Sequence, residues 1–336
     1  MSRLRDLAPS YFGFVMATGI VAIATRMAGY ERPARWVGTV ALAGYLILAA
    51  LNALRLVRHF AAVRADFRDH LKAPGFFTWV AATGVAGAVA LLLWGARETA
   101  AVLWAVAAAS WAFFTYAIFA ALTLKPEKPR LEHGISGAWL LAVVATQSVV
   151  VLAELLAPGA HAAAQAPLHF VAMALWLAGG MLYTWIIALI FYRYLFLRLA
   201  AEDFTAPYWI NMGAMAISAL AGSLLCANAP DAPLLQSLLP FLRGVTILCW
   251  ATATWWIPAL AILVGWRYGV SRYPLRYEPA YWSVVFPLGM YSAATHEMSR
   301  VLSLSFLQPV ASAFLALAAL AWLAAFVGLL RKEVRR

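Results

Sequence analysis

The side chains of this sequence that could do chemistry inside its long apolar stretches are mostly neutral hydroxyls and amides. Such groups could donate hydrogen bonds to a small anion without binding it too tightly. A Thr hydroxyl in an apolar helix has an equally common role, because it can donate to a carbonyl of its own helix. Both roles are open for the following candidates: Thr18, Thr83, Thr146, Gln147, Asn211 and Ser218.

Two adjacent ionisable residues, His296 and Glu297, form a second candidate group. Ionisable side chains inside a long apolar helix are functional candidates by default. Together they could relay a proton. Arg300, however, follows three residues after Glu297, one helical turn away, so an ordinary Glu–Arg pair beside an interfacial His is the preferred interpretation.

The remaining ionisable and thiol groups in apolar stretches are expected to have structural roles. Glu154 and Arg243 lie near the ends of their stretches and are predicted to extend their charged heads to water. His169 is a lone histidine, expected to be packed or interfacial and not a ligand. The two cysteines, Cys226 and Cys249, are predicted to be buried free thiols.

An enzyme or an electron-transfer subunit is the alternative class of function. A bis-histidine haem site needs two facing buried histidines, and His169 and His296 are the candidates. The sequence shows no Cys/His cluster, no paired buried carboxylates and no Ser–His arrangement, so neither catalysis nor a cofactor or metal is expected. A visible absorption spectrum of the purified protein would test this, since a haem would absorb above the protein band.

Composition identifies the elements that must position these side chains. Hydrophobic residues make up 65% of the 336 residues and charged residues 12%, against about 45–50% and about 25% in soluble domains. The chain is therefore predicted to be an all-α polytopic membrane protein, because the apolar stretches are too long and too evenly apolar for barrel strands. Ten spans are expected, at residues 9–28, 36–57, 75–95, 99–124, 136–157, 167–192, 207–228, 240–266, 280–299 and 307–330.

A phrase repeated five times relates these spans to one another. The copies begin at Pro9-Ser-Tyr11, Pro74-Gly-Phe76, Gly137-Ala-Trp139, Pro207-Tyr-Trp209 and Pro279-Ala-Tyr281. Seven residues after each aromatic come Thr18, Thr83, Thr146, Ala216 and Leu288, which are 65, 63, 70 and 72 residues apart. That period corresponds to two membrane-spanning helices with their loops.

The repeat predicts five helical hairpins in a quasi-five-fold arrangement within a single transmembrane domain, residues 1–336. The hairpins are expected at 9–57, 75–124, 136–192, 207–266 and 280–330. The odd-numbered spans are rich in Gly, Pro, Ser and Thr and should form an inner ring, because small residues let helices approach closely. The bulky, aromatic even-numbered spans should lie outside. A solid bundle of duplicated hairpins is the alternative, and the register of the copies favours a ring around an axis.

That register predicts which residues face the axis. Five residues after each shared aromatic come Met16, Ala81, Val144, Ala214 and Phe286, and three residues later, on the same face, come Gly19, Gly84, Gln147, Ile217 and Gly289. Phe286 is the one group of its layer large enough to plug a pore. It precedes Pro287, which removes a helix hydrogen bond and permits a local bend. Phe286 and Pro287 are therefore predicted to form a gate.

Charge predicts the orientation of the spans. All but six of the 25 cations fall at the end of the spans that also holds both termini; the exceptions are Arg26, Arg32, Arg35, Arg97, Arg243 and Arg300. By the positive-inside rule both termini are cytoplasmic, in the inner (plasma) membrane. The net charge of +11 is interpreted as topology signalling and contact with anionic membrane lipid. Nucleic-acid binding is not expected, because the basic residues lie in short loops.

The run Tyr281-Trp-Ser-Val-Val-Phe286-Pro287-Leu-Gly-Met290, with ten spans and the Ala-Thr-Gly phrases, resembles the tellurite-resistance/dicarboxylate transporter family. That family includes yeast malate and sulfite transporters and the plant guard-cell slow anion channel. The resemblance implies a homotrimer, each protomer with its own pore closed by a phenylalanine in the ninth span, here Phe286. It also implies small inorganic or organic anions as substrates. Both a passive anion channel and a proton-coupled carrier of C4-dicarboxylates or sulfite- and tellurite-type oxyanions stay open.

Overall fold

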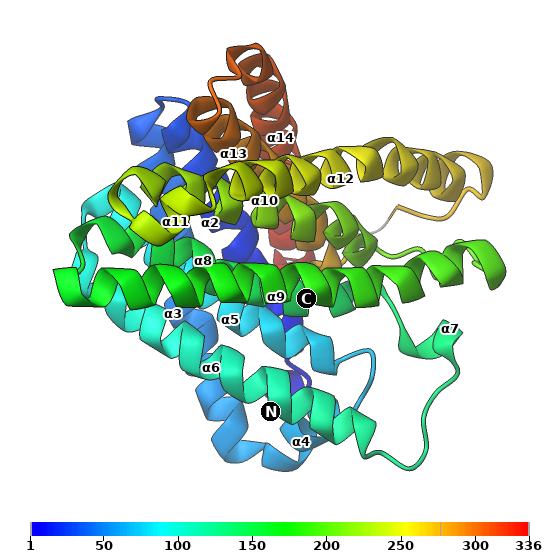
Figure 1. Cartoon of the computed structure of the whole chain (residues 1–336). Helices are drawn as coiled ribbons and strands as arrows, with labels where there is room; N and C mark the ends of the chain where they lie inside the picture. Colours follow the sequence, from blue (N-terminus) through cyan, green and yellow to red (C-terminus); the bar gives the residue numbers. More distant parts are fainter. Residues whose placement is uncertain (1, 276, 335–336) are drawn as a thin grey trace.

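Five helical hairpins build the molecule, as the repeat predicts (Figure 1). The computed structural model describes residues 2–275 and 277–334. Each hairpin pairs one inner with one outer helix. The inner helices are α2 (Gly13–Met27), α5 (Phe77–Trp94), α8 (Leu141–Leu156), α10 (Ile210–Asn228) and α13 (Trp282–Val301). The outer helices are α3 (Glu31–Arg58), α6 (Arg97–Thr123), α9 (Ala162–Phe196), α12 (Leu239–Gly265) and α14 (Gln308–Val334).

All ten predicted spans coincide with long helices. Within the described residues, nine helical segments are long and apolar enough to cross a membrane. The ninth predicted span, α13, is not among them; it carries polar side chains such as Thr295, His296 and Glu297. Shorter helices that the sequence did not predict lie before the first span, α1 (Ser2–Arg5), and in the connections, α4 (Phe60–Phe67), α7 (Leu131–Gly134) and α11 (Pro233–Ser237).

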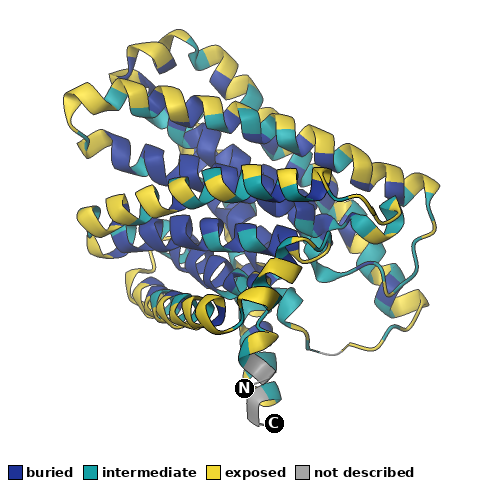
Figure 2. Ribbon diagram, turned by 90° about the horizontal axis from the view of Figure 1, so that it is seen from below, coloured by how far each residue is buried: buried dark blue, intermediate teal, exposed yellow. Residues whose placement is uncertain are grey.

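The inner helices form a closed ring, and the outer helices cover its seams. Around the ring α2 contacts α5, α5 contacts α8, α8 contacts α10, α10 contacts α13, and α13 returns to α2. Between 61% and 94% of the most apolar stretch is buried in α2, α5, α8 and α10, against 11–28% in the five outer helices. Figure 2 shows this as buried inner helices within exposed outer ones. The predicted division into inner and outer helices is confirmed.

Glycines allow the inner helices to approach one another at four of the five seams. A Cβ atom added to Gly19 would lie 2.4 Å from Val85 of α5, and one added to Gly289 would lie 3.0 Å from Ile20 of α2. A Cβ atom added to Gly84 would lie 3.1 Å from Ser148 of α8, and one added to Gly213 would lie 2.8 Å from Pro287 of α13. Membrane helices often associate in this way, since small residues permit close backbone packing where lipid supplies no hydrophobic drive.

Each copy of the repeated phrase forms a turn of 3₁₀ helix that leads into its inner helix. The turns are η1 (Pro9–Phe12), η2 (Ala73–Phe76), η3 (Gly137–Leu140), η5 (Ala206–Trp209) and η8 (Pro279–Tyr281). Consecutive turns contact each other and η8 contacts η1, so they form a second closed ring. We call this the N-terminal end of the ring. The repeat therefore marks the positions where the five parallel inner helices begin.

Hydrogen bonds join each outer helix to the inner helix of the next hairpin. Tyr45 of α3 pairs with Thr83 of α5, and Trp176 of α9 donates to the Ser218 carbonyl of α10. The other three are indole donors to Thr hydroxyls: Trp111 to Thr146, Trp250 to Thr295 and Trp322 to Thr18. The last of these links α14 to α2, so the five bonds close a circle around the molecule.

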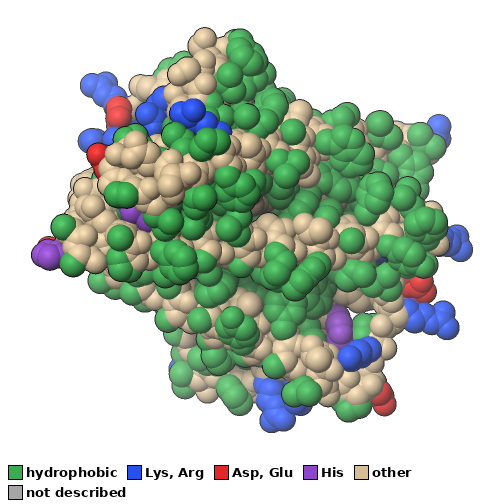
Figure 3. All heavy atoms as spheres, viewed as in Figure 1, with side chains coloured by type: hydrophobic (Ala, Val, Ile, Leu, Met, Phe, Trp, Pro, Cys, Tyr) green, Lys and Arg blue, Asp and Glu red, His purple; other side chains and the backbone are tan. Residues whose placement is uncertain are grey.

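Buried basic side chains fasten the connections at the N-terminal end. Arg55 at the end of α3 pairs with Asp66 of α4 at 2.5 Å, and Asp66 also accepts from Lys72 at 2.9 Å. That hydrogen bond and the carboxylate charge raise the pKa of Lys72. Arg193 of α9 donates to the Ile135 carbonyl at 2.8 Å. In Figure 3 hydrophobic side chains cover the middle of the face, while charged groups lie along its left, right and lower margins.

Gly137→Ala tests the ring of 3₁₀ turns. An added Cβ at Gly137 would lie 2.3 Å from the Pro207 carbonyl oxygen and 2.5 Å from the Tyr208 Cα. Because both are backbone atoms, η3 and η5 must separate, and we expect a loss of about 1–3 kcal/mol in stability. A lower thermal unfolding midpoint in detergent would show it. Gly180→Ala is the control, since nothing lies within 4 Å of its added Cβ; equal midpoints for the two variants would contradict the tight contact.

Candidate functional site: a cavity along the axis of the inner ring

One cavity of about 320 Å³ is lined by all five inner helices. It occupies the half of the ring where these helices end. Its apolar lining is spread over the five helices: Ile20 and Ile23 of α2, Val85 and Ala88 of α5, Val151 of α8, Leu220 and Leu224 of α10, and Met290 of α13. The cavity therefore lies on the axis that the repeat predicts.

Charged and amide side chains border the cavity toward the C-terminal ends of the inner helices. Arg26 comes from α2, and Glu297 and Arg300 come from α13. The Arg300 guanidinium pairs with the Glu297 carboxylate at 2.5 Å, which is the pair expected from their spacing. Glu154 of α8 and Asn228 of α10 complete this border. The cavity thus has a polar end and an apolar end.

The apolar end of the cavity stops above the predicted gate layer. Met290 lines the cavity, and Phe286 lies one helical turn earlier on the same face of α13. In the same way Met16 lies one turn before Ile20, and Val144 one turn before Ser148, which also lines the cavity. All five residues of the gate layer are at most 2% exposed: Met16, Ala81, Val144, Ala214 and Phe286. None of these five described residues lines the cavity, which therefore stops short of this layer.

Pro287 does not interrupt α13, which runs unbroken from Trp282 to Val301. Its ring packs against the backbone of α10 at Gly213, where an added Cβ would lie 2.8 Å from Pro287 Cγ. The proline therefore lies at the seam between α10 and α13. Its packing against α10 fixes the part of α13 that carries the adjacent Phe286.

The second predicted layer divides between the cavity and the helix seams. Gly84 and Ile217 line the cavity. Gly19 and Gly289 lie against neighbouring inner helices, as described above. Gln147 turns outward, where its amide donates to the Trp176 carbonyl of α9 at 3.0 Å.

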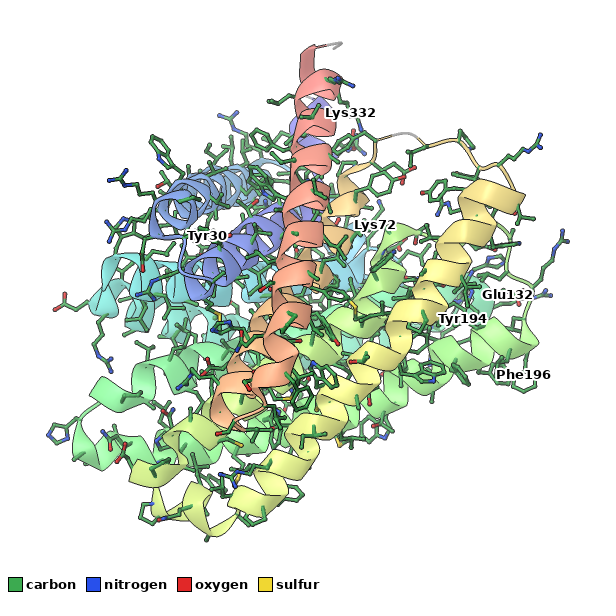
Figure 4. All side chains as sticks on the ribbon, turned by 90° about the horizontal axis from the view of Figure 1, so that it is seen from above. Tyr30, Lys72, Glu132, Tyr194, Phe196 and Lys332 are labelled. Carbon is green, nitrogen blue, oxygen red and sulfur yellow. The ribbon has the colours of Figure 1, made fainter. Side chains whose placement is uncertain are left out.

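The candidate hydroxyls and amides point mostly toward the outer helices. Thr18, Thr83 and Thr146 each pair with an outer-helix Tyr or Trp, and Thr83 and Thr146 also donate to carbonyls of their own helices. Ser218 donates to the Ala214 carbonyl. Asn211 donates to the Tyr194 hydroxyl (3.3 Å), whose ring reaches from α9 toward α12 (Figure 4). None of these five residues lines the cavity of the described structure.

His296 and Glu297 face different spaces. Glu297 borders the axial cavity, whereas His296 lines a separate crevice of about 670 Å³ between α2, α3, α13 and α14. Adjacent helical residues point about 100° apart, so the two side chains do not form one relay in this arrangement. His169 and His296, the two histidines that a bis-histidine haem site would need, lie in different surroundings. His169 belongs to α9 and pairs with Glu154.

The prediction that Glu154 extends to water is wrong. Its carboxylate is 0% exposed and lies 3.0 Å from the Nδ1 atom of His169. The amide of Asn228 donates to the same carboxylate at 2.7 Å. Burial is tolerated because the charge has found partners on α9 and α10, which sequence alone did not pair. Arg243 is exposed, as expected, and both cysteines are buried and free.

Comparison with known proteins identifies the family. The model of a family described as voltage-dependent anion channel matches residues 6–330, nearly the whole chain. The chain belongs to the voltage-dependent anion channel family. Membership confirms the resemblance inferred from the Phe286-Pro287 run and the ten spans. It also establishes a polytopic helical membrane protein, and transport of anions across a membrane is the activity that the family implies.

Relatives of this voltage-dependent anion channel family member extend the similarity to bacteria and archaea. An uncharacterized membrane protein of Mycobacterium tuberculosis is 36% identical over 149 residues, or 44% of this chain and 75% of that protein. Two uncharacterized transporters of Methanocaldococcus jannaschii are each 22% identical. The alignment with one covers 90% of this chain and 86% of that transporter, and the alignment with the other covers 89% and 87%.

Thr146→Val separates a structural from a conducting role for the threonines. The substitution leaves the Trp111 indole without its acceptor at 2.8 Å, so we expect a loss of about 0.6–2 kcal/mol in stability. Anion flux per folded protein should stay within about twofold, a barrier change of roughly 0.4 kcal/mol. Thr184→Val, at an exposed site on α9, is the control for stability. A tenfold loss of flux without destabilisation would instead place the Thr146 hydroxyl on the anion path.

Proposed function

We propose that this chain conducts small anions along the axis of its five inner helices and that Phe286 closes this path. The observation that carries the proposal is the axial cavity lined by all five inner helices, which ends directly above the buried layer containing Phe286. In that layer the other four side chains are Met, Ala, Val and Ala, so the phenyl ring is the largest group. Pro287 then acts beside the gate by fixing the seam to α10.

The chemistry of the lining favours anions that lose water easily. Apolar side chains cannot replace a hydration shell, so a strongly hydrated or multiply charged ion meets a high barrier. The five inner helices all start at the end opposite the cavity, where their dipoles favour negative charge. Small monovalent anions are therefore the proposed substrates.

The membrane arrangement is proposed to follow the positive-inside rule. The N-terminal end of the ring, with Arg55, Lys72 and Arg193, faces the cytoplasm, and the cavity opens to the outside. Arg276, Arg335 and Arg336, which contribute to the charge bias, lie outside the described residues. Both termini are then cytoplasmic in the inner membrane. A homotrimer with one pore in each protomer, embedded in lipid, completes the proposal.

A proton-coupled carrier of C4-dicarboxylates or sulfite- and tellurite-type oxyanions is the second candidate. Its support is that ionisable groups, Glu154 and Glu297, do border the cavity. The passive channel is favoured because the layer of Phe286 contains no ionisable side chain that could carry a proton across it. An imposed pH gradient that drives no net uptake against the anion's own concentration gradient, in wild type and in His296→Ala, supports the channel; uptake driven by the gradient supports the carrier.

Phe286→Ala tests the proposed gate. Removing the ring from a closed apolar layer should raise anion flux into proteoliposomes by about tenfold or more, equivalent to about 1.4 kcal/mol off the barrier to passage. Phe170→Ala is the matched control, because this ring is 57% exposed on the outer helix α9 and its loss should leave flux unchanged. Wild-type flux in a folded Phe286→Ala protein would contradict the gate.

A further inference from the structure

Three side chains from three helices form a buried polar cluster beside the cavity. Glu154 of α8 has His169 Nδ1 at 3.0 Å from both carboxylate oxygens, and Asn228 of α10 donates to Oε2 at 2.7 Å and to the Glu154 carbonyl at 2.9 Å. Within the described residues, His169 is the ion-pair partner of Glu154. Buried polar clusters are costly when incompletely satisfied, so this arrangement is a defined site and not a chance contact.

The hydrogen bonds determine how many protons the pair holds. The Asn228 NH₂ group can only donate, so Oε2 must accept. Between carboxylate and imidazole one proton lies in the Nδ1–O contact, and the pair then carries one net negative charge. The Nε2 atom of His169 has no hydrogen-bond partner among the described residues. A second proton can bind there, and the pair then becomes neutral overall.

The location places this charge at the edge of the cavity. The Glu154 side chain is 0% exposed, but the His169 side chain keeps 7% exposure near the start of α9. The carboxylate borders the cavity, so the charge of the pair acts on anions there. Histidine is also the side chain that ordinarily changes charge between about pH 5 and 8.

The other charged groups around the cluster do not neutralise the negative charge of the Glu154–His169 pair. Arg97 of α6 donates to the Leu156 carbonyl and not to Glu154. On the opposite helices Arg300 is paired with Glu297 of α13, and Arg26 of α2 lies 3.4 Å from Glu31. The charge that changes with pH beside the cavity is therefore that of Glu154 and His169.

The geometry points to Glu154 and His169 as a proton-binding site that controls anion entry into the axial cavity. At alkaline pH the net negative pair repels anions from the cavity. When His169 binds a second proton the repulsion ends, and anion flux rises as the pH falls. The inference rests on the proposed conduction path and adds to it an acid-activated device, distinct from the predicted pair His296 and Glu297.

Flux of a monovalent anion such as nitrate into proteoliposomes, at equal pH on both sides from 8 to 5, tests this inference. The Phe286→Ala background keeps the path open, and equal pH removes any driving force from a proton gradient. The four proteins compared are the background, Glu154→Gln, His169→Gln and the double variant. Glu98→Gln is the control, since Glu98 is an exposed carboxylate at the same end of the molecule.

The two single variants should differ at pH 8. Glu154→Gln removes the negative charge and should raise flux on the order of tenfold, whereas His169→Gln keeps the charge and should leave flux low. The double variant should be high and independent of pH, and Glu98→Gln should follow the background. A double variant with the background's pH profile would overturn the inference. Equal increases in both single variants would also overturn it, because they would indicate loosened packing.

Proton uptake by the purified protein provides a readout that does not depend on transport. Between pH 8 and 5 the double variant should bind about one proton fewer than its background. If the double variant and its background bind the same number of protons while flux is normal, the proton site is rejected and the conduction path is retained. Absent flux in the Phe286→Ala background would instead reject the path itself, whatever the uptake. Unchanged thermal midpoints among the variants would exclude unfolding as the cause.

Discussion

The circle of hydrogen bonds from each outer helix to the next inner helix is the interaction on which the rest of the structure depends. Lipid gives helices no hydrophobic reason to associate, so small-residue packing and polar contacts must specify their neighbours. Each such bond contributes only about 0.6 kcal/mol on average, but here five of them act around one closed ring. They fix which inner helix follows which, and the glycines at the seams set how closely the helices approach.

This constraint also explains the character of the axial path. Thr18, Thr83 and Thr146 are polar groups of the inner helices, and their hydroxyls are directed outward to hold the ring together. The other four residues of the proposed gate layer are small or aliphatic, which is why the Phe286 ring is the proposed gate. In the proposed path, charge is kept to the polar end of the cavity, where it can influence which ions enter without holding them at the layer of Phe286.

Much of the fold could be predicted from the sequence, because apolar length and a repeated phrase are local signals. The ten helices, the five hairpins and the inner and outer roles follow from them. The direction of the threonine hydroxyls could not be predicted in this way, because the partner of each hydroxyl lies on another hairpin. A signal existed: Tyr45, Trp111, Trp176, Trp250 and Trp322 are 66, 65, 74 and 72 residues apart, nearly the period of the inner helices. Glu154 was misjudged for a related reason, because its partners lie on two other helices and distance from a span's end says nothing about them.

Accessibility of single cysteines on either side of Phe286 tests most directly whether the axis is a path closed at that residue. Met290→Cys lies in the cavity and Ala81→Cys in the closed layer, with Cys226 and Cys249 replaced by Ser. A membrane-impermeant thiol reagent added from the cavity side should modify Met290→Cys in every background. It should modify Ala81→Cys only when Phe286 is also changed to Ala. Equal modification of Ala81→Cys with and without the Phe286 ring, or none in either, would contradict a path closed by Phe286.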